Sequence, residues 1–497
     1  MTRRKPNVLL IMTDQHRADM MSCAGRWDVP TPNIDRIAVR GTRFTNAYCP
    51  YPVCLASRSS LLTGLYAHHT GAVNNTDRLD WRYRTIAHHF SDNGYLTGLI
   101  GKMHFNDAHK HGFQYYLSIN DWLMYLGPKS VLYANEIANH PTSQDHFFST
   151  MIDDGAGFPD VSGLWEHGSP WVGQVKRFDF DTMRTMASEL EAEDHLDMFI
   201  ARESVKFLKS YAEHPFFLVT SFMKPHTPFF PPREYAEKYP IDDMILPPVG
   251  DIQQYPEHIQ KRIRITQSVK PRNRKAHMAG YRGNLAFVDT CIGYVYDALE
   301  ELGLLENTIV VYTSDHGEMD GDHGLFQKFC LFEPSVKVPL IISYPKHLPE
   351  NKVNDALIEY IGLYPTLAEL TETEMNTRTT LVEMQGAPKK IDSSSFSEML
   401  FNENAQGPDA VFAEYNLKAD ICQYMIRTHK YKYIHHEGAS HELYDLESDP
   451  QEDRNLINDP GMKGIIEELR DRLFEWYRPE ENVYKPKRRK RNVNVRV

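Results

Sequence analysis

The chain has 497 residues, of which 41% are hydrophobic and 25% charged, and it carries a formal net charge of −12 at pH 7. The composition is that of an ordinary globular protein, and the length favours one large domain with a smaller one. The acidic balance argues against nucleic-acid binding. No apolar run reaches about 18 residues, which argues against membrane association through a spanning helix. The short apolar run after the basic N-terminus indicates a core strand rather than a signal peptide, so we expect a cytoplasmic protein.

Continuous apolar runs predict buried strands in the first two-thirds of the chain. These runs are residues 8–12, 216–219, 309–312 and 338–342. Apolar residues between 285 and 299 recur at spacings of three and four, which is typical of a helix with one apolar face. Gly303 follows where a helix-ending glycine belongs. The alternation of strand-like and helix-like segments predicts an α/β fold.

The pattern changes after about residue 375. Short strand-like runs at 411–413, 423–426 and 431–434, followed by a helix-like segment at 461–477, predict a small antiparallel sheet with a helix. We therefore expect a catalytic α/β domain at 1–375 and a C-terminal α+β subdomain with a basic tail at 376–497. Residues 105–180 lack a strong period, and we expect an insertion there that shapes the substrate pocket. Residues 240–275 are rich in proline and charged residues, and we expect a second long excursion there.

The end of the chain is strongly basic, with the sequence KPKRRKR at residues 485–491. The simplest interpretation is a solvated tail. The alternatives are an arm that steers anions and an arm that docks onto another subunit of a homo-oligomer.

Polar side chains follow three of the predicted strands, at the edge where ligands gather in open α/β sheets. The three clusters are Asp14-Gln15-His16, Lys224-Pro225-His226 and Asp315-His316-Gly317-Glu318. Asp14 and Asp315 are candidate ligands for a hard cation. Gln15 can add an oxygen, and His316 can add a nitrogen, which leaves room for manganese. Each residue alone would more simply cap a turn or a helix, but three clusters together predict one site.

Cys54 differs from the other five cysteines, which are spread over the chain without a CxxC spacing and predict neither a zinc site nor a disulfide framework. It lies at a predicted helix start, with Arg58 four residues later on the same face. A helix N-terminus and a guanidinium both favour negative charge, which suits an anion or an activated nucleophile. The alternative is a small buried cysteine beside a surface arginine.

The segment Cys54-x-Ala56-x-Arg58, followed by Leu-Leu-Thr-Gly at 61–64, resembles the defining motif of the sulfatase family. Residues 94–104 resemble its second motif, and further matches follow in order at 224–228, 314–318, 321–328 and 443–456. The resemblance covers nearly the whole chain. It implies an α/β fold like that of alkaline phosphatase, in which a large domain has a central mixed sheet between helices and a smaller domain has an antiparallel sheet and a helix.

The resemblance implies hydrolysis of sulfate monoesters of the arylsulfatase type. In this family the motif cysteine is converted after translation to formylglycine, an aldehyde. A metal-bound hydrate of this aldehyde, formed from Cys54, would attack sulfur with one hydroxyl and later expel sulfate through the other. The partners implied are a small anionic sulfate ester and a formylglycine-generating maturation enzyme. The cofactor implied is one divalent cation, for which we expect Ca²⁺, with Mn²⁺ and Mg²⁺ as alternatives.

The family motifs also imply a role for individual residues. The cation would be held by Asp14, Gln15, Asp315 and His316, with Cys54 in its modified form as a further ligand. Catalytic roles are implied for Arg58, Lys102, His104, His226 and Lys328. Arg58 would hold the hydrate, the two lysines would bind sulfate oxygens, His226 would bind sulfate and is the candidate proton donor, and His104 would assist collapse of the sulfated intermediate. Asn75 is a candidate further contact to the substrate.

Three positions depart from the commoner family pattern. Ala56 stands where proline is commoner, Gln15 where many sulfatases have a second aspartate, and His316 where many have asparagine. Gln15 and His316, together with Asn75, resemble the related phosphonate monoester and phosphodiester hydrolases, which share the fold and the modified cysteine. Such a hydrolase, using the same site, is therefore the first alternative.

Lys102 and His104 favour the sulfatase, because the related diesterases resemble this sequence less at that motif. The second alternative is a non-catalytic protein that binds anions with an unmodified Cys54. The metal-ligand and cationic residues argue against it.

Overall fold

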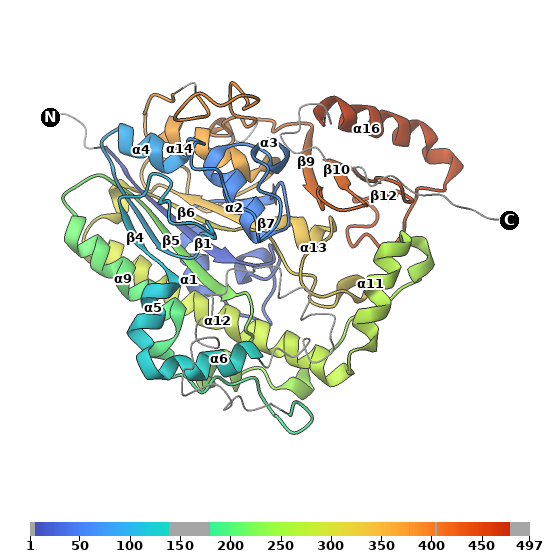
Figure 1. Ribbon diagram of the computed structural model, residues 1–497, viewed down its shortest axis with the longest axis horizontal. Helices are drawn as coiled ribbons and strands as arrows, with labels where there is room; N and C mark the ends of the chain where they lie inside the picture. The colour runs from blue at the N-terminus through green and yellow to red at the C-terminus, as the bar shows by residue number, and fades with distance from the viewer. Residues whose placement is uncertain (1–4, 139–178, 377, 403–404, 478–497) are drawn as a thin grey trace.

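The structure is a computed structural model that describes residues 5–138, 179–376, 378–402 and 405–477. Figure 1 shows a large sheet with helices on both faces and a smaller sheet beside it. The helices discussed below and their neighbours are α1 (Pro32–Val39), α2 (Cys54–Thr63), α3 (Ala67–Thr70), α4 (Ile86–Asp92), α5 (Ile119–Leu126), α6 (Ser130–Ala138), α9 (Leu196–Tyr211), α10 (Arg233–Ala236), α11 (Glu257–Ser268), α12 (Pro271–Glu301), α13 (Glu333–Val336), α14 (Leu363–Leu370), α15 (Glu398–Phe401) and α16 (Lys463–Trp476). The basic tail and residues 139–178 of the first predicted excursion lie outside the described residues.

The large sheet has eight strands in the order β4-β3-β5-β1-β6-β7-β2-β8. They are β1 (Asn7–Asp14), β2 (Gly41–Tyr48), β3 (Leu96–Gly101), β4 (Tyr115–Leu117), β5 (Phe216–Pro225), β6 (Thr308–Ser314), β7 (Lys337–Ser343) and β8 (Lys352–Glu359). β1 runs parallel to both of its neighbours, whereas β7 runs antiparallel to β6 and to β2, so the sheet is mixed. The four strands and the α/β class predicted from the sequence are confirmed.

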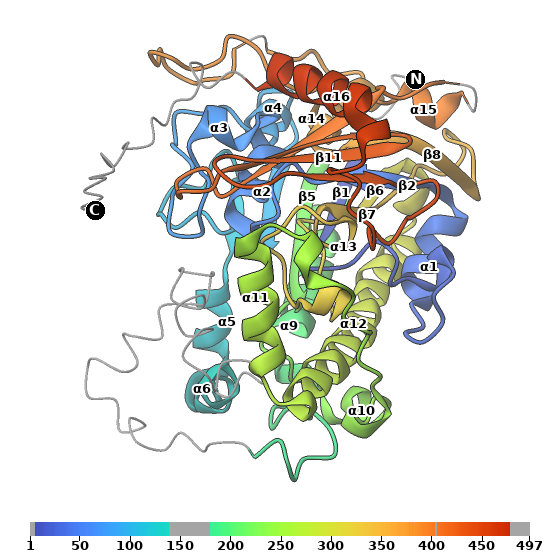
Figure 2. The same cartoon turned by 90° about the vertical axis from the view of Figure 1, so that its right-hand side faces the viewer.

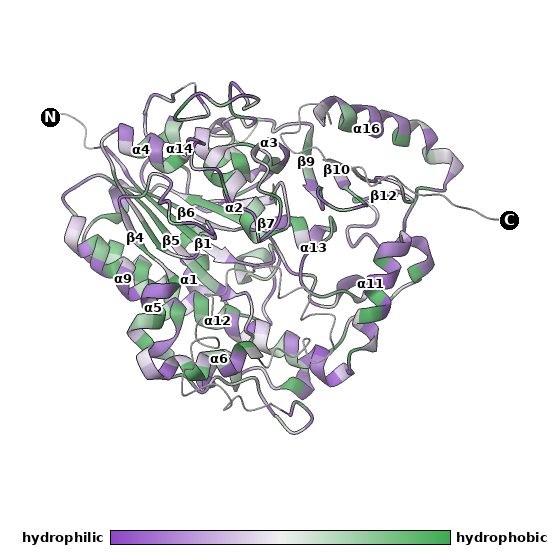
Figure 3. Cartoon of the chain, in the orientation of Figure 1, coloured by the Kyte–Doolittle hydropathy of each residue, from purple (hydrophilic) through white to green (hydrophobic). Residues whose placement is uncertain are grey.

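Burial on both faces explains why the central strands read as continuous apolar runs. Val8 and Leu10 of β1 belong to the core on one face of the sheet, and Leu9 and Ile11 belong to the core on the other. Helices α9 and α12 pack on the second face, while α2, α4 and α14 lie on the first (Figure 1). The hydropathy colours of Figure 3 follow this layering, with hydrophobic colour along the central strands.

The strand registers bring the polar strand ends together. Asp14 at the end of β1 pairs with Pro225, and Thr13 pairs with Ser314, the last residue of β6. On the other side of β5, Gly101 at the end of β3 pairs with Ser221. Gly101 has a φ of 105°, and a Cβ there would lie 2.0 Å from the Ser221 carbonyl oxygen, so only glycine allows this approach.

The C-terminal part forms a four-stranded antiparallel sheet in the order β12-β11-β10-β9, as predicted. Its strands are β9 (Ala410–Tyr415), β10 (Gln423–Thr428), β11 (Tyr431–His436) and β12 (Glu442–Asp445). Helix α16 lies across it and buries Leu469 and Leu473 (Figure 2). Fully buried Lys432 of β11 contacts Glu333 of α13 at 2.9 Å and Glu452 at 2.8 Å, which ties the two sheets together. The domain boundary near residue 375 stays a prediction.

The second predicted excursion differs from the expectation. Residues 240–275 contain the twelve-residue helix α11 and the start of α12, which begins at Pro271 rather than near residue 285. The first turns of α12 bury polar side chains such as Asn273, His277 and Arg282, so its apolar stripe is interrupted there. Among the described residues, no helix is long and apolar enough to cross a membrane.

A buried histidine makes stability depend on pH. Burial, assisted by Lys224, lowers the pKa of His195 to about 3. The unfolded chain binds this proton below about pH 6.5, whereas the folded chain does not, so the contribution of His195 is present above pH 6.5 and is lost as the pH falls. As the pH falls from 7.5 to 5, the free energy of unfolding should decrease less in His195→Phe than in the wild type. The difference between the two proteins should reach at most about 1.4 kcal/mol per pH unit.

The measurement is the denaturant midpoint of both proteins at the two pH values. His214→Phe, at an exposed position after α9, is the control and should keep the wild-type pH dependence. Parallel pH dependences for His195→Phe and the wild type would contradict the assignment.

Candidate active site

Cys54 is the first residue of α2, as predicted, and its side chain is fully buried. The backbone N–H of Leu55 donates to Oδ1 of Asn75 at 3.2 Å, which fixes the first turn of the helix. The Sγ atom of Cys54 lies 3.2 Å from Nε2 of His316 and 3.4 Å from Nζ of Lys328. Asn75 is thus near the site, although its contact to substrate stays a prediction.

Two further histidines approach the same side chain. His104, which follows β3, and His226, which follows β5, both hydrogen-bond Cys54. His104 has a φ of 66°, a left-handed conformation that non-glycine residues adopt at a cost and that is common at functional sites. Predicted site residues from the ends of four strands, β1, β3, β5 and β6, are therefore brought together around the Cys54 side chain.

Arg58 is completely buried and does not lie at the surface, so the alternative of a surface arginine is wrong. Its Nε donates to Oδ2 of Asp315 at 2.7 Å, and one terminal nitrogen donates to Oδ2 of Asp14 at 3.0 Å. The other terminal nitrogen donates to the Lys102 carbonyl at 2.7 Å and to Oγ of Ser221 at 2.8 Å. The guanidinium therefore holds the two carboxylates at a fixed separation and orients their remaining oxygens.

Four buried side chains could hold a cation. Asp14, Cys54, Asp315 and His316 each offer one ligand atom, and these atoms all lie within 4.8 Å of one another. Nδ1 of His316 is 3.0 Å from the Gly317 carbonyl, which can only accept, so Nδ1 carries the proton and Nε2 presents its lone pair to the group. Oxygen donors with one imidazole nitrogen fit Ca²⁺ or Mn²⁺.

The two carboxylates of the candidate cation group differ in pKa. Burial raises the pKa of Asp315, and Asp14 adds to this effect, although Arg58 opposes it. Burial would raise the pKa of Asp14 too, but the positive charges of Lys102 and Arg58 oppose it, and that pKa lies well below its usual range. A divalent cation bound by both carboxylates would favour the ionised form of each.

The surroundings of Cys54 favour negative charge at this position. Burial would raise the pKa of the thiol, but Lys102, Lys328 and His316 outweigh it, so the pKa lies well below the ordinary value. The positive charges of Lys102 and Lys328 would also stabilise an oxyanion or a bound sulfate.

His226 is neutral in this arrangement. Burial, with Lys328 adding to it, lowers its pKa to about 4. Its Nδ1 lies 3.0 Å from the Thr227 carbonyl and must donate to it, so Nε2 of the neutral ring is an acceptor. His226 must therefore be protonated before it can give a proton to a leaving group.

Residues that contact the predicted set were missed from the sequence. Ser221 hydrogen-bonds both Arg58 and the Lys102 carbonyl, and Oγ of Ser57 contacts the Asp315 carbonyl at 2.5 Å. No sequence signal distinguishes these serines from others. Glu318, which contacts Gln15, lies inside a matched motif, and that position could have been considered.

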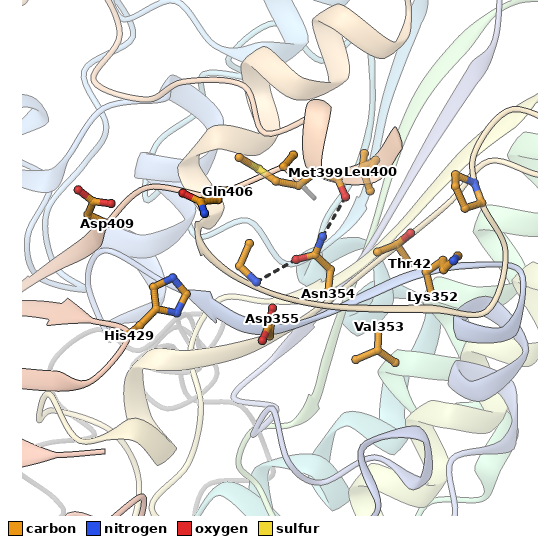
Figure 4. A pocket seen from close by; sticks show the side chains of 14 residues that line it. Thr42, Lys352, Val353, Asn354, Asp355, Met399, Leu400, Gln406, Asp409 and His429 are labelled. Atoms are coloured by element: carbon orange, nitrogen blue, oxygen red, sulfur yellow. Dashed lines mark hydrogen bonds between the residues drawn. The ribbon is translucent and has the colours of Figure 1, made fainter. Parts of the chain in front are cut away.

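A separate cavity of about 630 Å³ lies at the edge of the large sheet (Figure 4). It is bordered by β8, by the end of α15 and by residues 405–409, and Asn354 donates there to the Met399 carbonyl at 3.0 Å. None of the predicted site residues is among the described residues that line it. The catalytic group and this cavity are therefore different features of the molecule.

Comparison with known proteins agrees with this geometry. Residues 6–373 match the sulfatase family profile, and residues 321–478 match the profile described as N-sulphoglucosamine sulphohydrolase, C-terminal. An arylsulfatase of Clostridium perfringens (strain 13 / Type A) is 31% identical over 490 residues, which cover 97% of this chain and 96% of that protein.

Solved structures share the fold. The phosphonate monoester hydrolase of Agrobacterium radiobacter superposes with a TM-score of 0.74 at 21% identity, covering 95% of each chain. A protein in complex with its substrate D-glucosamine-2-N,6-O-disulfate superposes with a TM-score of 0.69 at 22% identity, covering 95% of this chain and 97% of that one. From the profile match and the relative of almost equal length, the chain belongs to the sulfatase family of sulfuric ester hydrolases.

Proposed function

We propose that the chain hydrolyses sulfate monoesters of the arylsulfatase type through a formylglycine formed from Cys54. The observation that supports this most directly is the position of the Cys54 side chain. Lys328, His104 and His226 contact it, and its Sγ atom also lies 3.7 Å from Oδ1 of Asp14 and 3.2 Å from Nε2 of His316. A sulfate monoester is a stable anion, so its cleavage needs concentrated positive charge beside a strong nucleophile. Family membership makes the chain an enzyme, which removes the non-catalytic alternative.

In the proposal, Asp14, Gln15, Asp315 and His316 hold one divalent cation, with an oxygen of the matured residue 54 as a further ligand. The formylglycine and the cation together would supply a hydroxyl nucleophile at neutral pH. Ca²⁺ is the expected ion because three of the four protein ligands offer oxygen, and His316 leaves Mn²⁺ as the main alternative.

Both lysines lie beside candidate cation ligands. Nζ of Lys102 lies 2.7 Å from Oδ2 of Asp14, and Nζ of Lys328 lies 2.9 Å from Oε1 of Gln15. A cation bound by Asp14 and Gln15 would weaken these two pairings and leave both ammonium groups to the terminal oxygens of the sulfate. The bound anion would also favour protonated His226, which could then give its proton to the leaving oxygen. His104 would remove the proton when sulfate is expelled.

Maturation of Cys54 is proposed to precede folding. The side chain is fully buried and lies on a helix, so a formylglycine-generating enzyme would need the segment in an extended form. Ala56, which stands where proline is commoner, lies in the first turn of α2 and is buried with Tyr51 and Val53.

A phosphonate monoester or phosphodiester hydrolase is the second candidate. Gln15 and His316, the residues that resemble those enzymes, support it: Gln15 accepts a hydrogen bond from Lys328, and His316 lies 3.2 Å from Sγ of Cys54. The two functions differ in the anion that they must bind. A sulfate monoester presents three terminal oxygens, whereas a phosphonate monoester presents two, so the sulfate needs more donors.

Paired kinetics of the wild type and Lys102→Ala test the choice. We expect a higher kcat/KM for 4-nitrophenyl sulfate than for 4-nitrophenyl phenylphosphonate. Lys102→Ala should lower the sulfate value by about 10²–10³-fold and the phosphonate value less, because one of the donors to the third oxygen is lost. Lys206→Ala, at an exposed position on α9, is the control. A higher phosphonate value that Lys102→Ala leaves unchanged would assign the chain to the second candidate.

A further inference from the structure

Gln15 is held rigidly at the end of β1. It is completely buried and has a φ of 68°, a left-handed conformation in which few non-glycine residues occur. Its backbone N–H donates to Oδ1 of Asp315 at 3.0 Å, and its carbonyl accepts from the Tyr281 hydroxyl at 2.8 Å. Because both backbone groups are engaged, the direction of the side chain is fixed by the fold.

The two partners of the Gln15 side chain determine which way its amide faces. Its Nε2 lies 2.5 Å from Oε2 of Glu318, and its Oε1 lies 2.9 Å from Nζ of Lys328. A carboxylate can only accept hydrogen bonds and an ammonium can only donate them. The NH₂ group must therefore face Glu318, and the oxygen must face Lys328, whose ammonium nitrogen also lies 3.4 Å from Sγ of Cys54 in the candidate cation group. Amide orientation, which is often ambiguous, is fixed here by chemistry.

Glu318 is itself fixed. It is completely buried, and its Oε1 accepts from the backbone N–H groups of Asp320, at 3.0 Å, and Gln327. Nε2 of His277 lies 3.4 Å from the same oxygen. The backbone N–H groups thus hold the carboxylate through Oε1, and its other oxygen, Oε2, accepts the hydrogen bond from Gln15.

We propose that Glu318 is a positioning residue that requires an amide at position 15 and thereby makes this ligand of the cation a neutral oxygen. An acidic residue at position 15 would place two carboxylates in contact inside the protein, where unpaired charge is costly. This inference rests on the cation site of the proposed function and adds the residue that orients one of its ligands.

An isosteric exchange of the two side chains tests the inference. In Glu318→Gln, the oxygen of the new amide stays with the two backbone N–H groups, so its NH₂ group faces the NH₂ group of Gln15. The Gln15 amide then turns, and its oxygen leaves the cation site. In the double variant Gln15→Glu with Glu318→Gln, a carboxylate meets an NH₂ group, the hydrogen bond is restored in the opposite direction, and the net charge is that of the wild type.

Calorimetric titration with Ca²⁺, on full-length protein of equal formylglycine content, is the first measurement. We expect Glu318→Gln to bind about ten- to a hundredfold more weakly than the wild type, as for other residues that orient metal ligands. The double variant should recover most of this loss. Asp289→Asn, which removes a buried carboxylate that caps α1, should bind Ca²⁺ as the wild type does.

Thermal unfolding in chelator is the second measurement, and it is independent of any cation. We expect Gln15→Glu alone to lower the Tm, because two carboxylates face each other, and Glu318→Gln added to it to raise the Tm again. If Gln15 acted only as a ligand of the cation, with no contact to Glu318, the second substitution would not raise the Tm measured in chelator.

The outcomes separate the two proposals. If the wild type binds Ca²⁺ and Glu318→Gln binds it equally well, or if the second substitution gives no rescue, the positioning role is refuted and the proposed function stands. If the wild type binds neither Ca²⁺ nor Mn²⁺, the cation site of the proposed function fails, and the positioning role fails with it.

Discussion

Cys54→Ala is expected to abolish turnover of an aryl sulfate, with a loss of at least about 10³-fold in kcat. The substitution removes the sulfur atom of Cys54, a side chain that Lys328, His104 and His226 all contact. Without it, the site can still bind an anion but has no nucleophile to attack sulfur. The measurement is the steady-state rate of 4-nitrophenyl sulfate hydrolysis with Ca²⁺ present.

Two further variants complete this prediction. Cys291→Ala, at a buried core position on α12, should keep its rate within a few-fold of the wild type. Cys54→Ser should release at most one equivalent of 4-nitrophenol, because a serine sulfate lacks the second hydroxyl that would expel sulfate. Continued turnover by Cys54→Ala would show that another group is the nucleophile.

Asp14→Asn is expected to reduce both cation affinity and turnover, by at least about 10²-fold and 10³-fold respectively. Asp14 combines two tasks. One oxygen pairs with Arg58 and Lys102, and the other faces Cys54 at 3.7 Å and His316 at 3.8 Å. Asparagine keeps the shape of the side chain but removes its charge. The divalent cation therefore loses an anionic ligand, and Arg58 and Lys102 lose their anionic partner. Breaking a buried pair in this way costs about 3–5 kcal/mol, which should also appear as a lower Tm.

Calorimetry with Ca²⁺, turnover and thermal unfolding are measured on the same preparation of Asp14→Asn. Asp289→Asn serves again as the control for loss of a buried carboxylate. Turnover within tenfold of the wild type, at a Ca²⁺ concentration that does not saturate the variant, would refute the role of Asp14 in holding the cation.

The sequence predicted the parts of the fold that depend on local pattern. Strands buried on both faces give apolar runs, and the residues directly after them meet at one sheet edge, so Asp14, His226 and Asp315 could be grouped from the sequence alone. The prediction failed where burial does not follow hydrophobicity. The first half of α12 buries polar residues such as His277 and Arg282, which pair with acidic residues of the segment after β6. These polar residues interrupt the apolar periodicity from which a helix is recognised in a sequence.

From the sequence, only the residues proposed to contact the cation or the substrate could be predicted; the residues that orient them could not. Ser221 and Glu318 act through contacts with residues far away in the sequence, and these contacts arise only when the strand ends come together. The geometry also changed one interpretation, since Arg58 bonds both carboxylates rather than lying beside a free anion site. Substrate preference depends on residues around the leaving group, where the sequence carries no motif.

The dependence of rate on the formylglycine content of residue 54 tests the central claim most directly. Preparations made with and without a coexpressed maturation enzyme are compared. Mass spectrometry of the peptide containing residue 54 gives the converted fraction, since conversion removes one sulfur and two hydrogens and adds one oxygen. If formylglycine supplies the nucleophile, kcat for 4-nitrophenyl sulfate should be proportional to this fraction and extrapolate to zero when Cys54 is unmodified. A rate that is independent of the fraction, or substantial at zero conversion, would contradict it.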